Sequence, residues 1–441
     1  MGGERQELMM DKVCVIGIWH LGTVTSACLA DFGYYVAGVD KDVKRVADLN
    51  RGIPPLFEPG LSELIKSNIE SKRLSYTTNL KQALSGTRYV LVSFDTAVDE
   101  KDEVDLSEIL SLSVKIGEYL ENGSLIVINS QVPIGTCDRI KSMIGQSRPS
   151  LEFDVAYSPE NLRLGQAIES FKNPRRIVIG ADSHETLDKV ERLFSPINAP
   201  KLRMGLKSAE MTKHMLNAFL GVSISFGNEM ANLCDELGVD ALKVVTALRL
   251  DERIGNKLPL LPGLGFSGAT LARDLKVLQH LGDSLNYETH LVDAVLCVNE
   301  QQGKLVLRKL GNIYSSINGL RIGVLGLTYK AGTSTLRRSV ALEIIRDMVA
   351  EGAQVKAYDP KADPEELATH NEFEVCCDPY TVAKDSDALV LVTEWPEFKE
   401  LDFARIRSLM KKPVFIDAKN MLDDDKMGKE GFIYLGVGRG R

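Results

Sequence analysis

Several features are missing from this sequence, and each absence narrows what the chain can be. No apolar run approaches the ~20 residues that a membrane-spanning helix needs. The seven cysteines show no CxxC or Cys/His spacing, which argues against a disulfide framework and a structural zinc site. The start, MGGERQELMMDKVCVIG, has neither the basic segment and cleavage site of a signal peptide nor the Ser or Thr of a myristoylation signal. We therefore expect a cytoplasmic protein without a bound metal.

A cluster of basic residues is also lacking. The 53 Lys and Arg against 61 Asp and Glu give a net charge of −8, so nucleic acid and anionic membranes are not the expected partners. A local basic pocket for a phosphorylated small molecule remains compatible with this balance. At 441 residues the chain is long enough for two to four domains.

Short apolar runs alternate with helical patterns in the two ends of the chain. The strands predicted in this way are 12–17, 35–40, 89–94, 125–129 and 176–180, then 322–326, 354–359, 388–393 and 413–417. Near-continuous Val, Ile and Leu runs joined by helices are typical of a parallel sheet covered on both faces. Residues 205–300 lose this alternation and are predicted to be nearly all helical. The expected fold is α/β, with two Rossmann-like doubly wound sheets joined by a central helical segment.

The first predicted strand leads into GIWHLG (17–22), a helix and a second strand that ends at Asp40. This is the context of a dinucleotide-binding turn, in which Gly17 permits the tight turn and Gly22 close packing of the helix. Trp19 takes the place of the middle glycine, so its indole must point away from the pyrophosphate or shield it. Asp40 suits the ribose hydroxyls of NAD, while Lys41 and Arg45 keep NADP open. An ordinary βαβ turn that binds nothing is the alternative.

The helix predicted over 206–233 carries apolar residues on much of its surface, and we expect it to be largely buried. Glu210, Lys213 and Asn217 follow at helical spacing on one polar stripe. Either Glu210 and Lys213 form a structural ion pair, or Lys213 and Asn217 hold an oxygen that becomes negative during a reaction. Glu160, in YSPENLRLG (157–165), follows a predicted strand end, where open α/β sheets bind ligands. Alternatively, Glu160 is an acid at the N-terminus of a helix, where it interacts with the helix dipole.

Taken together, these motifs resemble the UDP-glucose/GDP-mannose dehydrogenases, NAD-dependent enzymes that oxidise nucleotide sugars. The similarity extends in order over nearly the whole chain. It includes VCVIGIWHLG, LNRGIPPLFEPGL, SQVPIGT (130–136), SPENLRLGQAIESFKNPRRIVIG (158–180), LDERIG (250–255), GLGFSGATLARD (263–274) and VLGLTYKAGTSTLRRS (324–339). The resemblance implies an NAD-binding domain over 1–204, a helical dimerisation segment over 205–305 and a nucleotide-sugar-binding domain over 306–441. It also implies a UDP-sugar or other NDP-sugar substrate and a homodimer or higher homo-oligomer.

The resemblance assigns roles residue by residue. The catalytic positions are Lys213 and Asn217 for the oxyanion, Asp274 for water, Glu160 as general base and Thr270 at the nucleophile position. The cofactor-binding positions are Gly17, Trp19, His20, Leu21, Gly22, Asp40, Arg45, Thr96, Gln131 and Arg337. The substrate-binding positions are Leu162, Arg163, Lys213, Asn217, Arg253, Gly265, Phe266, Gly268, Lys330 and Lys419. Arg253 would reach the neighbouring subunit's substrate.

The chain departs from the family pattern most clearly in GLGFSGATLARD. Thr270 stands where the family has a nucleophilic cysteine. That cysteine captures an aldehyde, which allows a second hydride transfer and a thioester that water hydrolyses. A threonine hydroxyl is not ionised near pH 7 and needs an adjacent base. Cys137 is another thiol to consider, and Leu164 replaces an acid of the family.

Three functions therefore stay open. The first is a nucleotide-sugar dehydrogenase that works without covalent catalysis and may transfer a single hydride. The second is a conventional four-electron 6-dehydrogenase with an unrecognised nucleophile. The third is a non-catalytic protein that binds a nucleotide sugar.

Overall fold

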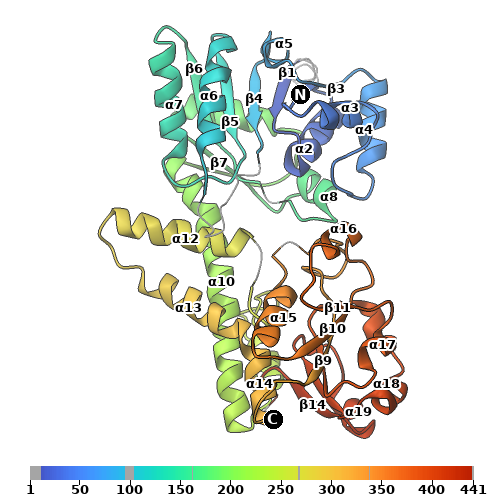
Figure 1. Cartoon of the computed structure of the whole chain (residues 1–441). Helices are drawn as coiled ribbons and strands as arrows, with labels where there is room; N and C mark the ends of the chain where they lie inside the picture. Colours follow the sequence, from blue (N-terminus) through green and yellow to red (C-terminus); the bar gives the residue numbers. More distant parts are fainter. Residues whose placement is uncertain (1–10, 95–103, 161, 267–268, 337, 440–441) are drawn as a thin grey trace. The chain divides into compact units, whose positions relative to one another are not determined.

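The computed structural model describes residues 11–94, 104–160, 162–266, 269–336 and 338–439, and the chain divides into two compact units that meet in sequence at Met215 and Leu216. Each unit is an α/β layer structure built on one sheet (Figure 1). The first unit contains β1 (Lys12–Ile16), α2 (His20–Asp31), β2 (Tyr35–Val39), α3 (Val43–Asn50), α4 (Leu61–Glu70), β3 (Leu74–Thr77), α5 (Leu80–Leu84), β4 (Tyr89–Val92), α6 (Ser107–Tyr119), β5 (Ser124–Ile128), α7 (Thr136–Ser147), β6 (Phe153–Tyr157), α8 (Ala167–Lys172), β7 (Ile177–Ala181), α9 (His184–Leu193) and β8 (Lys201–Met204).

The strands of the first unit lie in the order β3-β2-β1-β4-β5-β6-β7-β8. The order reverses between β1 and β4, which is where open α/β sheets bind dinucleotides. The expectation of a parallel sheet holds from β3 to β6 but is wrong at β6 and β7, which pair antiparallel. The reason is the connection 158–176, which holds only the short helix α8 and returns to the neighbouring strand without crossing the sheet.

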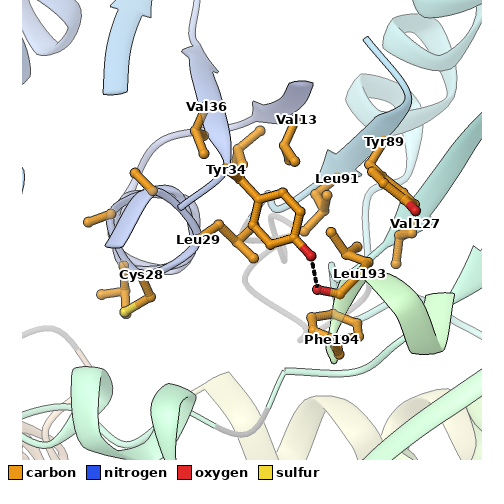
Figure 2. Close-up of a cluster of buried hydrophobic side chains, with 14 of the residues drawn as sticks. Val13, Cys28, Leu29, Tyr34, Val36, Tyr89, Leu91, Val127, Leu193 and Phe194 are labelled. Atoms are coloured by element: carbon orange, nitrogen blue, oxygen red, sulfur yellow. Dashed lines mark hydrogen bonds between the residues drawn. The ribbon is translucent and has the colours of Figure 1, made fainter. Parts of the chain in front are cut away.

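The core of this unit is centred on helix α2, which is buried along almost its whole length. Figure 2 shows Tyr34, at the end of α2, among Val13, Leu29 and other apolar side chains. The Tyr34 hydroxyl donates a hydrogen bond of 2.9 Å to the carbonyl oxygen of Leu193. The polar end of a buried ring is thereby satisfied, as burial requires. This packing fixes the C-terminal end of α2 and the start of β2 against the end of α9.

The second unit has a sheet in the order β11-β10-β9-β12-β13-β14, in which all strand pairings among the described residues are parallel. Its strands are β9 (Arg321–Leu325), β10 (Gln354–Tyr358), β11 (Glu374–Val375), β12 (Ala388–Leu391), β13 (Val414–Asp417) and β14 (Ile433–Gly436). Its helices are α11 (Ala241–Arg249), α12 (Ala269–Ser284), α13 (His290–Gly303), α14 (Leu305–Ile313), α15 (Val340–Ala350), α16 (Pro364–Leu367), α17 (Pro379–Ala383), α18 (Phe403–Leu409) and α19 (Asp424–Lys429), with a 3₁₀ turn at Pro396–Glu400.

The nine strands predicted from apolar runs are all present, with ends that shift by one or two residues. Five further strands, β3, β6, β8, β11 and β14, have no such continuous run. Burial explains two of these cases, because β3 alternates buried and exposed positions and both residues of β11 are exposed. The helical character predicted for 205–300 is confirmed by α10 (Leu206–Leu237), α11, α12 and α13.

Helix α10 spans 32 residues, and one expectation about it is wrong. It was expected to be largely buried, yet it exposes an apolar stripe. The exposed members are Met215, Phe219, Phe226, Leu233 and Leu237, with relative exposures from 49% to 72%. Their spacing of four and seven residues places them along one side of the helix.

The predicted ion pair between Glu210 and Lys213 is not the arrangement that forms. Glu210 is fully buried and accepts hydrogen bonds from the backbone N–H groups of Gly135, at 2.6 Å, and Cys137, at 2.9 Å. These groups belong to the start of α7, whose first N–H groups have no partner within the helix. Glu210 therefore caps α7 from a distant part of the chain and leaves Lys213 to another partner.

We expect Glu210→Gln to lower the free energy of unfolding by about 1–3 kcal/mol, because it removes the charge from two charge-assisted hydrogen bonds and turns an amide N–H₂ toward a donor. Chemical denaturation of the two proteins measures the difference. Lys207→Gln is the matched control, since the ion pair between Lys207 and Asp138 on the same helix is exposed and 3.4 Å long. Equal stability losses in the two variants would contradict the capping role.

Candidate active site

The predicted dinucleotide-binding turn forms between β1 and α2. Gly17 has a φ of +87°, and a Cβ there would lie 2.9 Å from the ring of Phe94. A Cβ on Gly22 would lie 1.9 Å from the carbonyl oxygen of Gly17. Both positions therefore require glycine. The first N–H groups of α2, from His20 to Gly22, point out of the helix start, and Trp19 gives no side-chain cap. Such a helix start attracts a phosphate.

Asp40 lies directly after β2 and is 6% exposed. Its carboxylate accepts hydrogen bonds from the backbone N–H of Ile18, at 3.2 Å, and from Nη1 of Arg45, at 2.6 Å. The Arg45 guanidinium lies over the indole of Trp19, 5.3 Å from the ring centroid. Trp19 therefore packs beneath Arg45, which explains how an indole fits where the middle glycine is usual.

The two cations that kept NADP open are both engaged by carboxylates. Arg45 lies between Asp40 and Asp42, with 3.5 Å from Nη2 to the second carboxylate. Lys41 donates to Glu108 at 2.7 Å. One guanidinium between two carboxylates leaves a net negative charge, which repels a 2′-phosphate and accepts hydrogen bonds from a ribose.

A cavity of about 670 Å³ opens beside Asp40. Its lining combines apolar side chains such as Leu80, Leu112 and Phe94 with the carboxylate of Asp40. This size and this mixture are typical of small-molecule pockets. The turn, the acid and the cavity together fit the phosphate, ribose and base of a dinucleotide.

We expect Asp40→Ala to raise the dissociation constant for NAD about 10- to 100-fold, since it removes a charged acceptor from the ribose. The same change should narrow the preference for NAD over NADP, because Arg45 then lacks its closest carboxylate. Titration with each cofactor, followed by Trp19 fluorescence, measures both effects. Asp42→Ala is the milder control, because the Asp42 carboxylate lies 3.5 Å from the Arg45 guanidinium and that of Asp40 2.6 Å. If the ratio of the NAD and NADP affinities did not change in Asp40→Ala, Asp40 would not be the acid that binds the ribose.

Glu58 is a residue of this region that the sequence did not reveal. Its side chain is almost completely buried and accepts hydrogen bonds from the backbone N–H groups of Gly165, at 3.0 Å, and Ala167, at 2.7 Å. Nε2 of His20 lies 3.1 Å from the same carboxylate. Glu58 therefore joins the cofactor turn to the segment that follows β6, which includes Glu160 and the predicted substrate positions Leu162 and Arg163.

Lys213 pairs with Glu160. Its Nζ lies 3.2 Å from Oε1 of Glu160 and 3.0 Å from the carbonyl oxygen of the same residue. The lysine side chain is 11% exposed and the glutamate 24%. A cation and a carboxylate are therefore fixed at a partly sheltered point just beyond β6. The sequence did not predict this pairing, because the two residues are 53 positions apart in the chain.

Asn217 follows one turn later on α10 and is paired with Asp274 of α12. Nδ2 of Asn217 donates to Oδ2 of Asp274 over 2.5 Å, and both side chains are buried. Nε of Arg273 lies 4.0 Å from Oδ1 of Asp274. The buried carboxylate thus orients the Asn217 amide. Four of the five predicted catalytic residues therefore lie in two pairs, Glu160 with Lys213 in the first unit and Asn217 with Asp274 in the second.

The glycine-rich loop before α12 is clamped by amide side chains. Asn299 accepts from the backbone N–H of Phe266 at 2.8 Å and donates to its carbonyl oxygen at 3.0 Å. Gln302 donates to the carbonyl oxygen of Gly263 at 2.6 Å, and Asn228 accepts from its N–H. A Cβ at Gly265, whose φ is +83°, would lie 2.4 Å from the Asn299 side chain. Residues 263–266, the described part of this loop, are therefore held by side chains of α10 and α13.

Thr270 lies in the first turn of α12 and is exposed, whereas Asp274, one turn further on, is buried. Cys137 is fully buried, and burial together with the nearby Glu210 raises the pKa of its thiol well above the usual value. A thiol in that setting is a poor nucleophile, so Cys137 is not a substitute for the family's cysteine.

The remaining predicted positions are described one by one. Lys330 and Lys419 follow the carboxyl ends of β9 and β13 in the second unit, and Nζ of Lys419 is 3.0 Å from Glu394. Arg253 is exposed and pairs with Asp251. Leu21 and Gln131 are buried. Thr96, Gly268 and Arg337 lie outside the described residues.

The described helices include none with the length and apolar composition needed to cross a membrane. Nor does the described part of the chain bring three or more potential metal ligands together.

A dinucleotide-binding unit that carries a Lys–Glu pair, followed by a second unit of Rossmann type, defines an NAD-dependent oxidoreductase. Three family models match in chain order. They are the NAD-binding, central and UDP-binding domains of the UDP-glucose/GDP-mannose dehydrogenase family, over residues 11–198, 207–301 and 323–424. The chain belongs to the UDP-glucose/GDP-mannose dehydrogenase family.

Individual relatives agree with this result. The chain is 37% identical over 432 residues to UDP-glucose 6-dehydrogenase TuaD of Bacillus subtilis (strain 168), which covers 98% of this chain and 94% of the relative. It is 34% identical to a UDP-glucose 6-dehydrogenase of Pseudomonas aeruginosa, with 98% of both covered. A solved UDP-glucose dehydrogenase from Pyrobaculum islandicum is 30% identical with a TM-score of 0.87, covering 97% of this chain and 98% of that one. NAD as cofactor and oxidation of a CH–OH group follow.

Proposed function

We propose that this chain oxidises a UDP-sugar similar to UDP-glucose and transfers hydride to NAD without forming a covalent thioester. The observation that carries the proposal is the pairing of Lys213 with Glu160 and of Asn217 with Asp274. A protein that only bound the sugar nucleotide would have no physical need for a cation, an oriented amide and two carboxylates together. The UDP-binding domain of the family and the names of the relatives favour a UDP-sugar.

The roles follow from the chemistry of each group. Bound NAD would accept the hydride, held by the α2 turn, Asp40 and the cavity beside it. Lys213 and Asn217 stabilise negative charge on the oxygen of the carbon that is oxidised, as preorganised donors do. Glu160, already hydrogen-bonded to Lys213, accepts the proton of the hydroxyl group. Asp274 holds the Asn217 amide in place and orients water.

Thr270 supports a reaction that stops after one hydride or hydrates the aldehyde slowly. An alcohol needs a strong adjacent base before it can attack a carbonyl, and a carboxylate such as Asp274 is a weak base for the exposed hydroxyl of Thr270. Cys137 is buried away from reaction. The expected product of the fast phase is therefore a carbonyl compound.

Counting NADH per sugar consumed tests this proposal. Purified protein is incubated with NAD and a panel of UDP- and GDP-sugars, and a carbonyl reagent traps any aldehyde or ketone. One equivalent of NADH with a trapped carbonyl is the expected result. Two equivalents with a uronate product would instead establish the four-electron 6-dehydrogenase that the relatives' names suggest.

We also propose a homodimer or larger homo-oligomer, supported by the exposed apolar stripe of α10, since such faces mark interaction surfaces. Sedimentation measures the oligomeric state, and a variant that carries both Phe219→Lys and Phe226→Lys should be a monomer.

The functional division into residues 1–204, 205–305 and 306–441 stays a proposal, to which the three family-model ranges are close.

A further inference from the structure

A small cavity lies on the inner side of Glu160, within the first unit. Its volume is about 60 Å³, and Glu160 shares its lining with Asn129, Ser158, Arg176 and Leu162. A cavity holds a water when it has about 10–15 Å³ of space and polar groups to bond it. This one has room for one or two water molecules.

One wall of the cavity carries a buried polar atom that lacks a partner. Asn129, at the end of β5, is 7% exposed, and its Nδ2 donates to the carbonyl oxygen of Ser158 at 2.7 Å. Among the residues that the structure describes, none donates a hydrogen bond to its Oδ1. Leaving a buried acceptor unsatisfied costs about 1–3 kcal/mol, so a bound water is the expected partner for this oxygen.

Arg176 provides a donor in the same cavity. It precedes β7 and is partly buried, and no hydrogen bond or ion pair engages its guanidinium among the described residues. The antiparallel pairing of β6 with β7 brings this arginine beside the segment that follows β6. The cavity therefore offers an unpaired acceptor, an unpaired cationic donor and the carboxylate of Glu160.

We propose that this cavity is a water site, anchored by Asn129 and Arg176, which supplies the water that Glu160 activates to hydrate the aldehyde. The inference rests on the proposed function. Glu160 first releases to solvent the proton that it accepted during hydride transfer. In the step, a water O–H proton then passes to the Glu160 carboxylate, while the water oxygen bonds to the carbonyl carbon and the C=O π electron pair moves to the carbonyl oxygen. The proton then returns to the former carbonyl oxygen and gives a geminal diol, with no electrons gained or lost. Asn129 and Arg176 act through the water and are positioning residues.

The first test is direct and independent of turnover. A crystal structure of the full chain with NAD, at a resolution that shows ordered water, should place a water within hydrogen-bond distance of Oδ1 of Asn129. A dry cavity would overturn the proposal even if the enzyme were active. A water that is present in an inactive protein would instead remove the proposed function and leave the water site.

The second test follows oxygen from solvent. In H₂¹⁸O, hydration of the enzyme-bound aldehyde introduces ¹⁸O into the product. Arg176→Met should slow this incorporation about three- to tenfold, the effect of one lost hydrogen bond, while the first hydride transfer in a single turnover keeps its rate. Arg175→Met is the matched control, because Arg175 is exposed and does not line the cavity. Equal effects of Arg176→Met on both steps would show a merely structural role and overturn the proposal.

Discussion

Lys213→Met is expected to lower kcat by about 10²- to 10³-fold, the loss typical when one donor to a developing oxyanion is removed. The reason lies in how the lysine is held before any substrate binds. Its side chain is 11% exposed, and its Nζ is fixed by two oxygens of Glu160. Because the cation is already in position, little free energy is spent on reorganising the site when negative charge develops on the substrate oxygen. Single-turnover measurements of NADH formation at saturating sugar and NAD isolate this step.

The affinity for the sugar nucleotide should change much less than the rate, because the charge that Lys213 stabilises develops only in the transition state. Lys207→Met is the control on the same helix, since Lys207 is exposed and forms a 3.4 Å pair with Asp138. A rate loss of the same size in both variants would point to damage to α10. A normal rate in Lys213→Met would remove Lys213 from the reaction.

The elements predicted correctly are those with a local signal. Continuous apolar runs such as VCVI revealed β1, β4 and β12, because strands buried on both faces need them. Strand β11 has two exposed residues and β3 alternates, so neither carries that signal. The antiparallel turn into β7 depends on whether a connection crosses the sheet, a property of the packed fold.

In the candidate site, too, some features could be predicted from the sequence and others could not. Asp40 follows from its spacing after a glycine turn, and the positions of Lys213 and Asp274 follow from the family motifs. The hydrogen-bond and ion-pair partners of these residues could not be predicted from the sequence. Glu160 and Lys213 are 53 residues apart and Glu58 and Ala167 are 109 apart, and no periodicity within one helix records such contacts. Glu210 illustrates the limit, because its spacing suggested Lys213 while its carboxylate binds the start of α7.

Thr270→Cys is expected to raise the yield from one NADH per sugar to two, with a uronate as product. The position favours a thiolate, because residue 270 lies in the first turn of the 16-residue helix α12, where the helix dipole lowers the pKa of a thiol. The thiolate sulfur would add to the aldehyde carbon as a thiohemiacetal. Loss of the second hydride gives a thioester, and water releases the acid and restores the thiol. NADH counting with product analysis measures the gain, with Thr270→Ser as the control that keeps a hydroxyl and one equivalent.

The accessibility of position 270 allows the reactivity of an introduced thiol to be measured separately from turnover. Thr270 is exposed, so an introduced thiol should react with iodoacetamide, and bound sugar nucleotide should protect it. An alkylatable, substrate-protected thiol that still gives one equivalent would show that the missing sulfur is not what limits the reaction. In that case a second hydride transfer could come only from the hydrated aldehyde, and its rate would depend on the water at Glu160. Combining Thr270→Cys with Arg176→Met separates the two routes: covalent capture no longer needs hydration of the aldehyde, so the double variant should keep two equivalents.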